Sequence, residues 1–422
     1  MQRQPTSFLL GHVAPVMSLD CRDWMLASGS EDKTCRIWDL RTEKVHKALT
    51  GFDSAVTTTS FTSADVHTIY VGSGRKIYTY DLRMESLLLN VDQAAKVYDG
   101  AEDEINQIDI NYKASYLAAC DDAGDVRVLD LKTEKWMRPL ERKHQNIAMT
   151  VQFVPKKELQ ALTGGMDKLV VAWDFYKGRA TQLIETETPQ PAAVQSKQLF
   201  NPPFVHSIAA HPSGTRAAVG LGDGTVQFLH TAADPPTAPS LDSASTLSST
   251  TPTKKNKKKA PAGSDNWVVG GRLVDAHSSP IATIGYAGFN SNWLVTSANN
   301  GTVAVWDDQA ARYESSLLQQ EMDHRLMLQQ QLQKKKPTAQ AIAAVEALGP
   351  LPVGRPVEPI LEFKTTHVFE RVNCIATSQS IPGGEDGHQA AGDPAKNLLF
   401  VAGTHPRTGD KKLQGRIAVY PL

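Results

Sequence analysis

A pair of short strand-like segments recurs seven times along the chain, and this repetition limits the fold more than any other feature. In the clearest copy, residues 26–41, small apolar residues lead into an acidic turn at Glu31 and Asp32 and then into an alternating run ending Ile-Trp-Asp. Two such segments around a turn are typical of a β-hairpin. The ending, or a variant of it, is centred on Trp38, Tyr80, Leu129, Trp173, Leu229, Trp306 and Tyr420. This self-similarity over 422 residues predicts one large repeat architecture.

The spacing of the seven endings indicates the kind of repeat. They lie 42, 49, 44, 56, 77 and 114 residues apart, and the pair Gly11-His12 lies 26 residues before Trp38. Gly-His followed at this distance by Trp-Asp resembles one blade of the WD-repeat β-propeller family, whose blades take ~40–45 residues. The resemblance implies an all-β fold, a single seven-bladed propeller over residues 1–422. The long later spacings then reflect insertions in blades 5 to 7.

The two ends of the chain predict how the ring closes. The last repeat stops at its third strand, GRIAVYPL, whereas the segment from Thr6 to Leu10 precedes the first strand of blade 1 and has no place within it. Pairing of this N-terminal strand with blade 7 would remove both open sheet edges. We therefore expect that deletion of the first ten residues destabilises the fold.

Polar residues at matching positions of two repeats are expected to form hydrogen-bonded networks, in which a carboxylate caps a turn and reaches a His of the preceding loop. The two networks comprise His12, Ser28, Asp32 and Trp38 in blade 1, and His144, Thr163, Asp167 and Trp173 in blade 4. In blades 5 and 6 the carboxylate position holds Asp223 and Asn300. Ser, His and Asp also make up a hydrolase triad. Their recurrence with the blades and their link to a structural Trp favour a role in the fold instead.

Three segments interrupt the repeats. Residues 231–265, in blade 5, are rich in Pro, Ser, Thr and Ala, so they are expected to be disordered. They carry a basic run of Lys254, Lys255, Lys257, Lys258 and Lys259. This run fits a nuclear localisation signal, a tether to nucleic acid or a solubilising stretch. Residues 308–357, in blade 6, combine a predicted helix that continues to Lys336 with a Pro-containing stretch, and residues 379–396 form a loop in blade 7.

The predicted helix has a weak apolar face, and two roles are open for it. It either covers the rim of the propeller or docks a partner, through Leu317, Leu318, Met322, Leu326, Leu328 and Leu332. All three insertions join the first to the second strand of a blade or the third to the fourth, and these connections leave a propeller on one face. We therefore expect the insertions to crowd that face over blades 5 to 7. Arg41 would lie on the same face across the ring, and the opposite face would be open.

The composition argues against several classes of protein. A net charge of −1 offers no general attraction for nucleic acid or an anionic membrane. Four scattered cysteines argue against a disulfide framework and against zinc. No stretch approaches the ~20 apolar residues of a membrane span, and the N-terminus lacks the layout of a signal peptide. We expect a monomeric propeller of the cytoplasm or nucleus that is not an enzyme, with no catalytic, cofactor or metal site and no small-molecule substrate.

The order of several segments carries a closer resemblance. The stretches DEINQIDINYKASYLAACDDAGDVRVLDLKTEK, HQNIAMTVQFVP, LFNPPFVHSIAAHPSGTRAAVGLGDGTVQF and the terminal IAVYPL resemble the family of WD repeat-containing protein 53. This resemblance is strongest from blade 3 to blade 5 and does not cover the helix of blade 6. It implies protein binding and no biochemical activity beyond that.

The end of the first repeat also resembles the motif by which many propellers dock on the large β-propeller adaptor of cullin-4 RING ubiquitin ligases. Its core, Trp-Asp-x-Arg, is here Trp38, Asp39, Leu40 and Arg41; the next blade reads Tyr80, Asp81, Leu82 and Arg83, and later blades have Lys132, Tyr176 or Gln309 at the Arg position. The resemblance implies a non-enzymatic substrate receptor that docks through Trp38, Asp39, Arg41, Asp81 and Arg83. Arg suits such a site because its planar fork pairs with carboxylates or carbonyls in two places.

Two other functions fit the same sequence. An Arg at this position is also common as the solvated end of a strand, which leaves a general scaffold without a link to a ligase. The lysine run favours a third reading, a nuclear propeller associated with chromatin or RNA.

Overall fold

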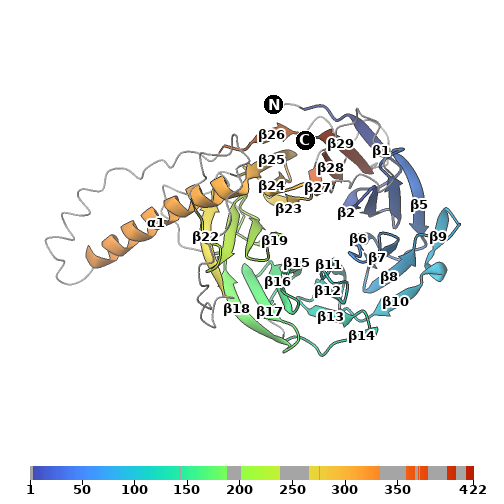
Figure 1. Cartoon of the computed structure of the whole chain (residues 1–422), viewed down its shortest axis with the longest axis horizontal. Coiled ribbons are helices and arrows are strands. Elements are labelled where there is room, and N and C mark those ends of the chain that lie inside the picture. Colours follow the sequence, from blue (N-terminus) through green and yellow to red (C-terminus); the bar gives the residue numbers. More distant parts are fainter. Residues whose placement is uncertain are drawn as a thin grey trace, which may run out of the picture.

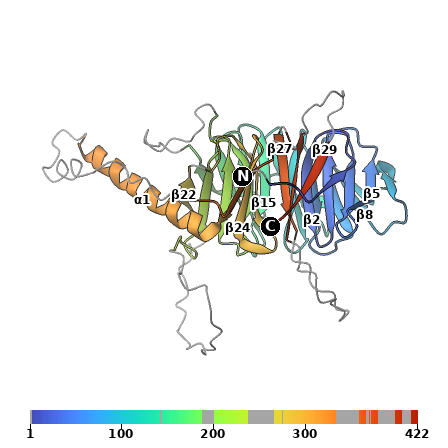
Figure 2. The same cartoon turned by 90° about the horizontal axis from the view of Figure 1, so that it is seen from above.

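Seven β-sheets surround a central channel in the described part of the chain, as the blades of a propeller (Figure 1). The computed structural model describes residues 3–141, 144–187, 201–237, 266–274, 276–332, 358–365, 369, 371–378, 397–404 and 415–422. Seen edge-on, the blades form a thick disc (Figure 2). The predicted all-β, seven-bladed fold is confirmed, and each of the seven predicted endings lies on the third strand of its blade.

The strands of each blade are given in order from the channel outwards. Blade 1 has β2 (Val16–Arg22), β3 (Met25–Ser30), β4 (Cys35–Asp39), β5 (Lys44–Thr50) and β9 (Leu88–Asn90). Blade 2 has β6 (Val56–Phe61), β7 (Thr68–Ser73), β8 (Lys76–Asp81) and β10 (Lys96–Asp99). Blade 3 has β11 (Ile105–Ile110), β12 (Tyr116–Asp121), β13 (Val126–Asp130) and β14 (Lys135–Trp136). Blade 4 has β15 (Ala148–Phe153), β16 (Gln160–Gly165), β17 (Leu169–Asp174) and β18 (Arg179–Glu185).

The remaining blades follow the same order. Blade 5 has β19 (Val205–Ala210), β20 (Arg216–Leu221), β21 (Val226–Thr231) and β22 (Trp267–Leu273). Blade 6 has β23 (Ile281–Ala287), β24 (Asn290–Ala298), β25 (Thr302–Asp307) and β26 (Leu361–Lys364). Blade 7 has β27 (Arg371–Thr377), β28 (Leu398–Thr404), β29 (Gly415–Pro421) and β1 (Ser7–Leu10). A short 3-10 helix, η1 (Val91–Gln93), follows β9, and α1 (Asp308–Leu332) follows β25.

The N-terminal strand closes the ring. β1 pairs antiparallel with β29, with Ser7 opposite Val419 and Leu10 opposite Arg416. Leu9 is buried among the side chains shared by blades 7 and 1. The predicted closure is confirmed, and the outermost strand of blade 7 comes from the opposite end of the chain.

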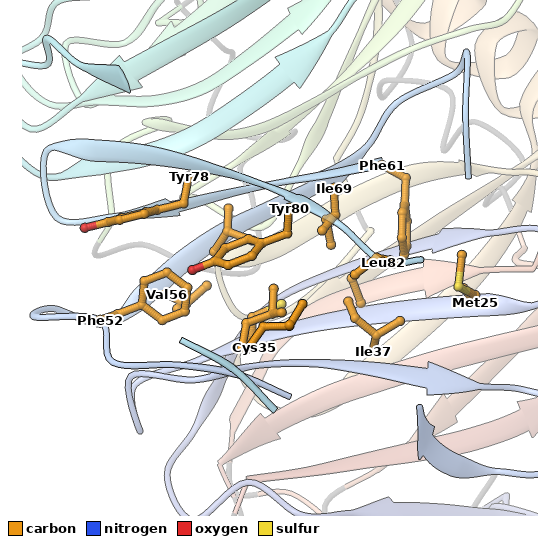
Figure 3. Close-up of a cluster of buried hydrophobic side chains, with 14 residues drawn as sticks. Met25, Cys35, Ile37, Phe52, Val56, Phe61, Ile69, Tyr78, Tyr80 and Leu82 are labelled. Atoms are coloured by element: carbon orange, nitrogen blue, oxygen red, sulfur yellow. The ribbon is translucent and has the colours of Figure 1, made fainter. Parts of the chain in front are cut away.

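One apolar cluster fills each interface between neighbouring blades. Between blades 1 and 2, Met25 and Ile37 pack against Ile69 and Tyr80, and all four are fully buried (Figure 3). Burial of one large apolar side chain contributes about 1.5–3 kcal/mol. Since each blade is stabilised mainly by its neighbours, the blades that have lost parts of the repeat motif still have the same fold.

The innermost strands of neighbouring blades are joined by side chains rather than by a continuous ladder. The backbone N–H of Ile108 donates to Thr58 Oγ1 at 3.1 Å, and that of Val151 donates to Gln107 Oε1 at 3.0 Å. A second row uses carboxylates: the N–H of Phe153 donates to Asp109 Oδ2 at 2.6 Å. Polar residues on the first strands therefore satisfy backbone donors that would otherwise be unpaired in the channel.

Two of the insertions lie between neighbouring strands of a single blade. β21 and β22 are neighbours in blade 5 on either side of residues 232–266, and β25 and β26 are neighbours in blade 6 around α1. The helix covers residues 308–332 of the predicted helical stretch. The lysine run from Lys254 to Lys259, the rest of residues 333–357 and the loop of residues 379–396 lie outside the described residues.

The first half of α1 covers the rim of the propeller, one of the two roles that the sequence left open, and docking of a partner stays a prediction. This half packs against β22, where a Cβ on Gly271 would lie 2.0 Å from the backbone of Ser315. Ala311, Arg312, Ser315 and Met322 are buried on this side. The distal half extends beyond the edge of the disc (Figures 1 and 2), and Met327 there is 53% exposed.

Two expectations about the faces are wrong. The opposite face does not join its strands by tight turns alone, because β18 ends at Glu185 and β19 begins only at Val205, and β28 ends at Thr404 and β29 begins only at Gly415. The blade 7 insertion is also not across the ring from Arg41, since β2 of blade 1 packs directly on β27. The closed ring makes blade 7 the neighbour of blade 1, which a linear count of repeats conceals.

Candidate functional site

Two matching turns follow the third strands of blades 1 and 2. In blade 1 the backbone N–H of Arg41 donates to Asp39 Oδ1 at 2.9 Å, and its guanidinium donates from Nε to Oδ1 at 3.0 Å and from Nη2 to Oδ2 at 2.8 Å. In blade 2, Arg83 donates to Asp81 from the same three atoms, at 2.9, 2.9 and 2.8 Å. Both arginine side chains are 62% exposed. We call these two Asp–Arg pairs the arginine forks.

The local sequence explains this geometry. An Asp that accepts the backbone N–H two residues ahead forms an Asx turn. The turn brings an Arg at that second position back over the same carboxylate, where its planar fork makes two parallel hydrogen bonds. The hydrogen bonds from Arg83 hold the pKa of Asp81 at about 2. The side chain of Arg41 likewise lowers the pKa of Asp39.

The loops around the forks fix them on one face. The backbone N–H of Leu40 donates to the carbonyl of Trp24 at 2.9 Å, and that of Leu82 donates to the carbonyl of His67 at 2.7 Å. These bonds join the two loops of each blade in the same way. The guanidinium of Arg41 lies over the ring of Trp24, 4.1 Å from its centroid. This cation–π contact adds to the orientation of Arg41.

Blades 3 and 4 also have an Asp that accepts a backbone N–H of the following turn, but no fork; in blade 4 that N–H belongs to Lys177, three residues after Asp174. In blade 3 the backbone N–H of Lys132 donates to Asp130 Oδ1 at 2.8 Å, and in blade 4 Lys177 Nζ donates to Asp174 Oδ2 at 2.7 Å. A lysine offers a single charged point where arginine offers a fork. Among the described turns at this position, those of blades 1 and 2 present arginine.

Trp38, which the sequence placed among the docking residues, belongs to the interior. It is 2% exposed, and its Nε1 donates to Ser28 Oγ at 2.8 Å. His12 joins Ser28 through Nε2 at 2.8 Å and Asp32 through Nδ1 at 2.9 Å. Only the part of the docking motif that follows Trp38, the turn with Asp39 and Arg41, therefore lies at the surface.

Burial and hydrogen bonding oppose each other at the carboxylate of this network. Burial alone would raise the pKa of Asp32, but its hydrogen bond and charge interaction with His12 hold that pKa at about 2. Blade 4 repeats the arrangement, with His144 bonded to Thr163 at 2.7 Å and to Asp167 at 3.1 Å. Trp173 Nε1 donates to Thr163 Oγ1 at 2.8 Å.

Blade 6 retains three members of the network. His277 Nε2 bonds to Thr296 Oγ1 at 2.7 Å, and Trp306 Nε1 donates to the same oxygen at 2.9 Å. The hydroxyl oxygens of Ser28, Thr163 and Thr296 are all on fully buried residues. They are held by Trp donors and lie beyond the reach of a substrate, so these networks act in the fold.

A strap that the sequence did not predict joins blades 1 and 2. After Arg83 the chain leaves blade 2 and forms β9, which pairs in parallel with β5 of blade 1 before β10 returns to blade 2 (Figure 1). Lys47, only 3% exposed, donates from Nζ to the carbonyls of Met84 and Ser86, the latter at 2.9 Å. The strap thus begins at one arginine fork and ends on the blade that carries the other.

The described residues offer few other candidates for chemistry. No group of three or more His, Cys, Asp or Glu among them is arranged to hold a metal ion. The four cysteines are buried thiols, and burial raises the pKa of Cys35, Cys120 and Cys374. No helix in the part of the chain that the structure describes is long and apolar enough to cross a membrane.

Comparison with known proteins shows which family parts of the chain resemble. The model of the WD domain, G-beta repeat, matches residues 3–39 and 271–307, which include the histidine–tryptophan networks of blades 1 and 6. The chain is a seven-bladed β-propeller in which these two segments are similar to WD repeats. Such a propeller is in general a protein-interaction scaffold.

Similar curated proteins cover part of the chain. It is 30% identical over 233 residues to the WD repeat-containing protein 53 homolog of Dictyostelium discoideum, which covers 52% of this chain and 62% of that protein. It is 24% identical to human Protein NEDD1 over 43% of this chain and 27% of that protein. Ribosome biogenesis protein YTM1 of Debaryomyces hansenii is 26% identical over 40% of this chain and 38% of its own length. The matches therefore span less than two thirds of each relative.

Proposed function

We propose that this propeller is a non-enzymatic substrate receptor that docks on the β-propeller adaptor of cullin-4 RING ubiquitin ligases through the arginine forks. The observation that carries the proposal is the repetition of the same bidentate Asp–Arg turn, with the same three hydrogen bonds, on adjacent blades of one face. Two arginines held at a fixed separation suit a single rigid partner. Arg is also enriched among the residues that dominate interface energy.

The face of the disc opposite the arginine forks suits a scaffold role. The connections between blades leave there, and the mouth of the channel at that face includes Glu31, His206 and Arg371. A client protein would bind at this side while the forks hold the adaptor. The alternative that stays open is a scaffold whose partners are unrelated to any ligase.

A quantitative binding experiment separates these functions. The full chain and the double variant Arg41→Ala, Arg83→Ala are each titrated against purified adaptor. Truncation of an interface hot spot costs ~2 kcal/mol or more, so we expect the Kd to rise at least about 30-fold. Lys177→Ala, in the matching turn of blade 4, is the control and should leave the Kd unchanged. Failure of the wild-type chain to bind, or equal binding by the double variant, would refute the ligase function.

A further inference from the structure

The arginine forks are neutralised within the chain. Each guanidinium already shares two hydrogen bonds with its own carboxylate, at 2.8–3.0 Å in blade 1 and 2.8–2.9 Å in blade 2. Each carboxylate is also held by a backbone N–H of the turn. A guanidinium has five N–H groups, so about three on each arginine stay available to a partner, while the pair as a whole is nearly uncharged.

The residues that follow each fork add negative charge. Both loops read Asp-Leu-Arg-x-Glu, as Asp39 to Glu43 in blade 1 and Asp81 to Glu85 in blade 2. Glu43 and Glu85 are exposed. In blade 1 the exposed Lys44, opposite Asp39 in the ladder, brings residues 39–44 to no net charge, whereas residues 81–85 of blade 2 keep one net negative charge. Neither loop therefore attracts an acidic segment of a partner.

Apolar side chains lie beside the forks. Met84, the residue after Arg83, is 38% exposed, and Val45 at the start of β5 is 37% exposed. In the strap, Leu87 and Leu88 are 71% and 59% exposed. A partner that covers these side chains removes water from the forks, and a hydrogen bond to a desolvated donor is worth more than one in water.

We propose that the forks recognise uncharged acceptors, namely main-chain carbonyl oxygens of a protein loop whose apolar side chains cover Met84 and Val45. This inference rests on the docking function proposed above and specifies its chemistry. Asp39 and Asp81 act as positioning residues, since they aim the remaining N–H groups and cancel the charge that an uncharged partner could not compensate.

A charge-removing substitution gives opposite results for the two kinds of partner. In the double variant Asp39→Asn, Asp81→Asn the amide oxygen can still accept the backbone N–H, but the guanidinium loses its ionic partner. For carbonyl acceptors, binding of the full chain to purified adaptor should weaken about 5-fold or more. For an acidic partner, two additional net positive charges should tighten it. Asp174→Asn, in the matching Asp–Lys turn of blade 4, is the control.

Two further measurements protect the test from a folding artefact. The Kd of the wild-type chain should change less than about 3-fold between roughly 50 mM and 500 mM NaCl, because neutral acceptors are insensitive to screening. The variant Arg41→Lys, Arg83→Lys keeps the charge but loses the fork, so it should bind as weakly as the alanine variant. Tighter binding by the Asn variant, steep salt dependence, or full binding by the Lys variant overturns the inference while leaving the docking function intact. No binding by the wild-type chain overturns both.

Discussion

The carboxyl of Asp109 in the channel gives a prediction about stability whose magnitude changes with pH. Asp109 lies on β11 and lines a cavity of about 570 Å³ at one mouth of the channel, together with Asp20, Ser60 and Gln152. Its Oδ2 accepts the backbone N–H of Phe153 from the next blade at 2.6 Å. Burial raises the pKa of Asp109 from 3.8 to about 7, against the lowering effect of this and other hydrogen bonds.

The raised pKa implies a cost at neutral pH. The folded protein keeps a proton on Asp109 up to about pH 7, whereas the unfolded chain loses it near pH 3.8. Each unit of pKa difference corresponds to about 1.4 kcal/mol, so the penalty grows from near zero below pH 4 to roughly 3–5 kcal/mol above pH 7. Stability therefore falls with rising pH across this window. Asp109→Asn removes the ionisation and keeps an oxygen that can accept from Phe153.

Urea unfolding followed by Trp fluorescence at several pH values tests this. We expect Asp109→Asn to match the wild type near pH 4 and to exceed its unfolding free energy by at least about 1 kcal/mol at pH 8, since the partial exposure of Asp109 in the cavity reduces the full penalty. Asp81→Asn is the opposite control, because Arg83 lowers the pKa of Asp81 to about 2 and the lost stabilisation is present at neutral pH. A gain for Asp109→Asn that is equal at pH 4 and pH 8 would refute the linkage.

Two other predictions concern the parts that hold the ring and the helix. Deletion of the first ten residues removes β1 and exposes the edge of β29. The melting temperature, measured by scanning calorimetry, should therefore fall by several degrees, and dimers or aggregates, measured by light scattering, should increase. An unchanged melting temperature would contradict the closure. Asp308 is fully buried, accepts from Tyr286 Oη at 2.8 Å and lies 3.1 Å from Arg216 Nε. Asp308→Ala leaves buried arginines without this partner, so it should cost about 3–5 kcal/mol, and limited proteolysis should cut α1 earlier than in Asp307→Ala.

The fold was predictable because its signals are periodic. The Trp-Asp endings at Trp38, Trp173 and Trp306 recur in phase with the blades, and the networks with their histidines depend on residues at fixed offsets. Closure by β1 was also predictable. The N-terminal apolar segment had no partner strand and blade 7 lacked a fourth strand, so pairing the two covers both edges. These inferences need only local pattern and the rule that sheet edges must be covered.

The strap between blades 1 and 2, and the distribution of long connections over the two faces, were not predictable in the same way. Nothing in the local sequence of Leu88 to Asn90 indicates a parallel pairing with Ala48 to Thr50 of blade 1. That pairing depends on the burial of Lys47, a residue that sequence patterns place on the surface. The role of Asp109 could not be predicted for a related reason. Its partner is a backbone N–H of the next blade, so no side-chain motif identifies it.

The strap also bears on the proposed docking function, because it links blade 1 to the loop that follows Arg83. Two arginines can act together only if the distance between them is fixed before the partner arrives, because ordering them on binding costs free energy. The chain that leaves Arg83 is held on blade 1 by the ladder from Ala48 to Thr50 and by Lys47, which donates to the carbonyls of Met84 and Ser86. The blade that carries Arg41 is thereby connected to the loop that carries Arg83. Folding, rather than binding, supplies the free energy of this alignment.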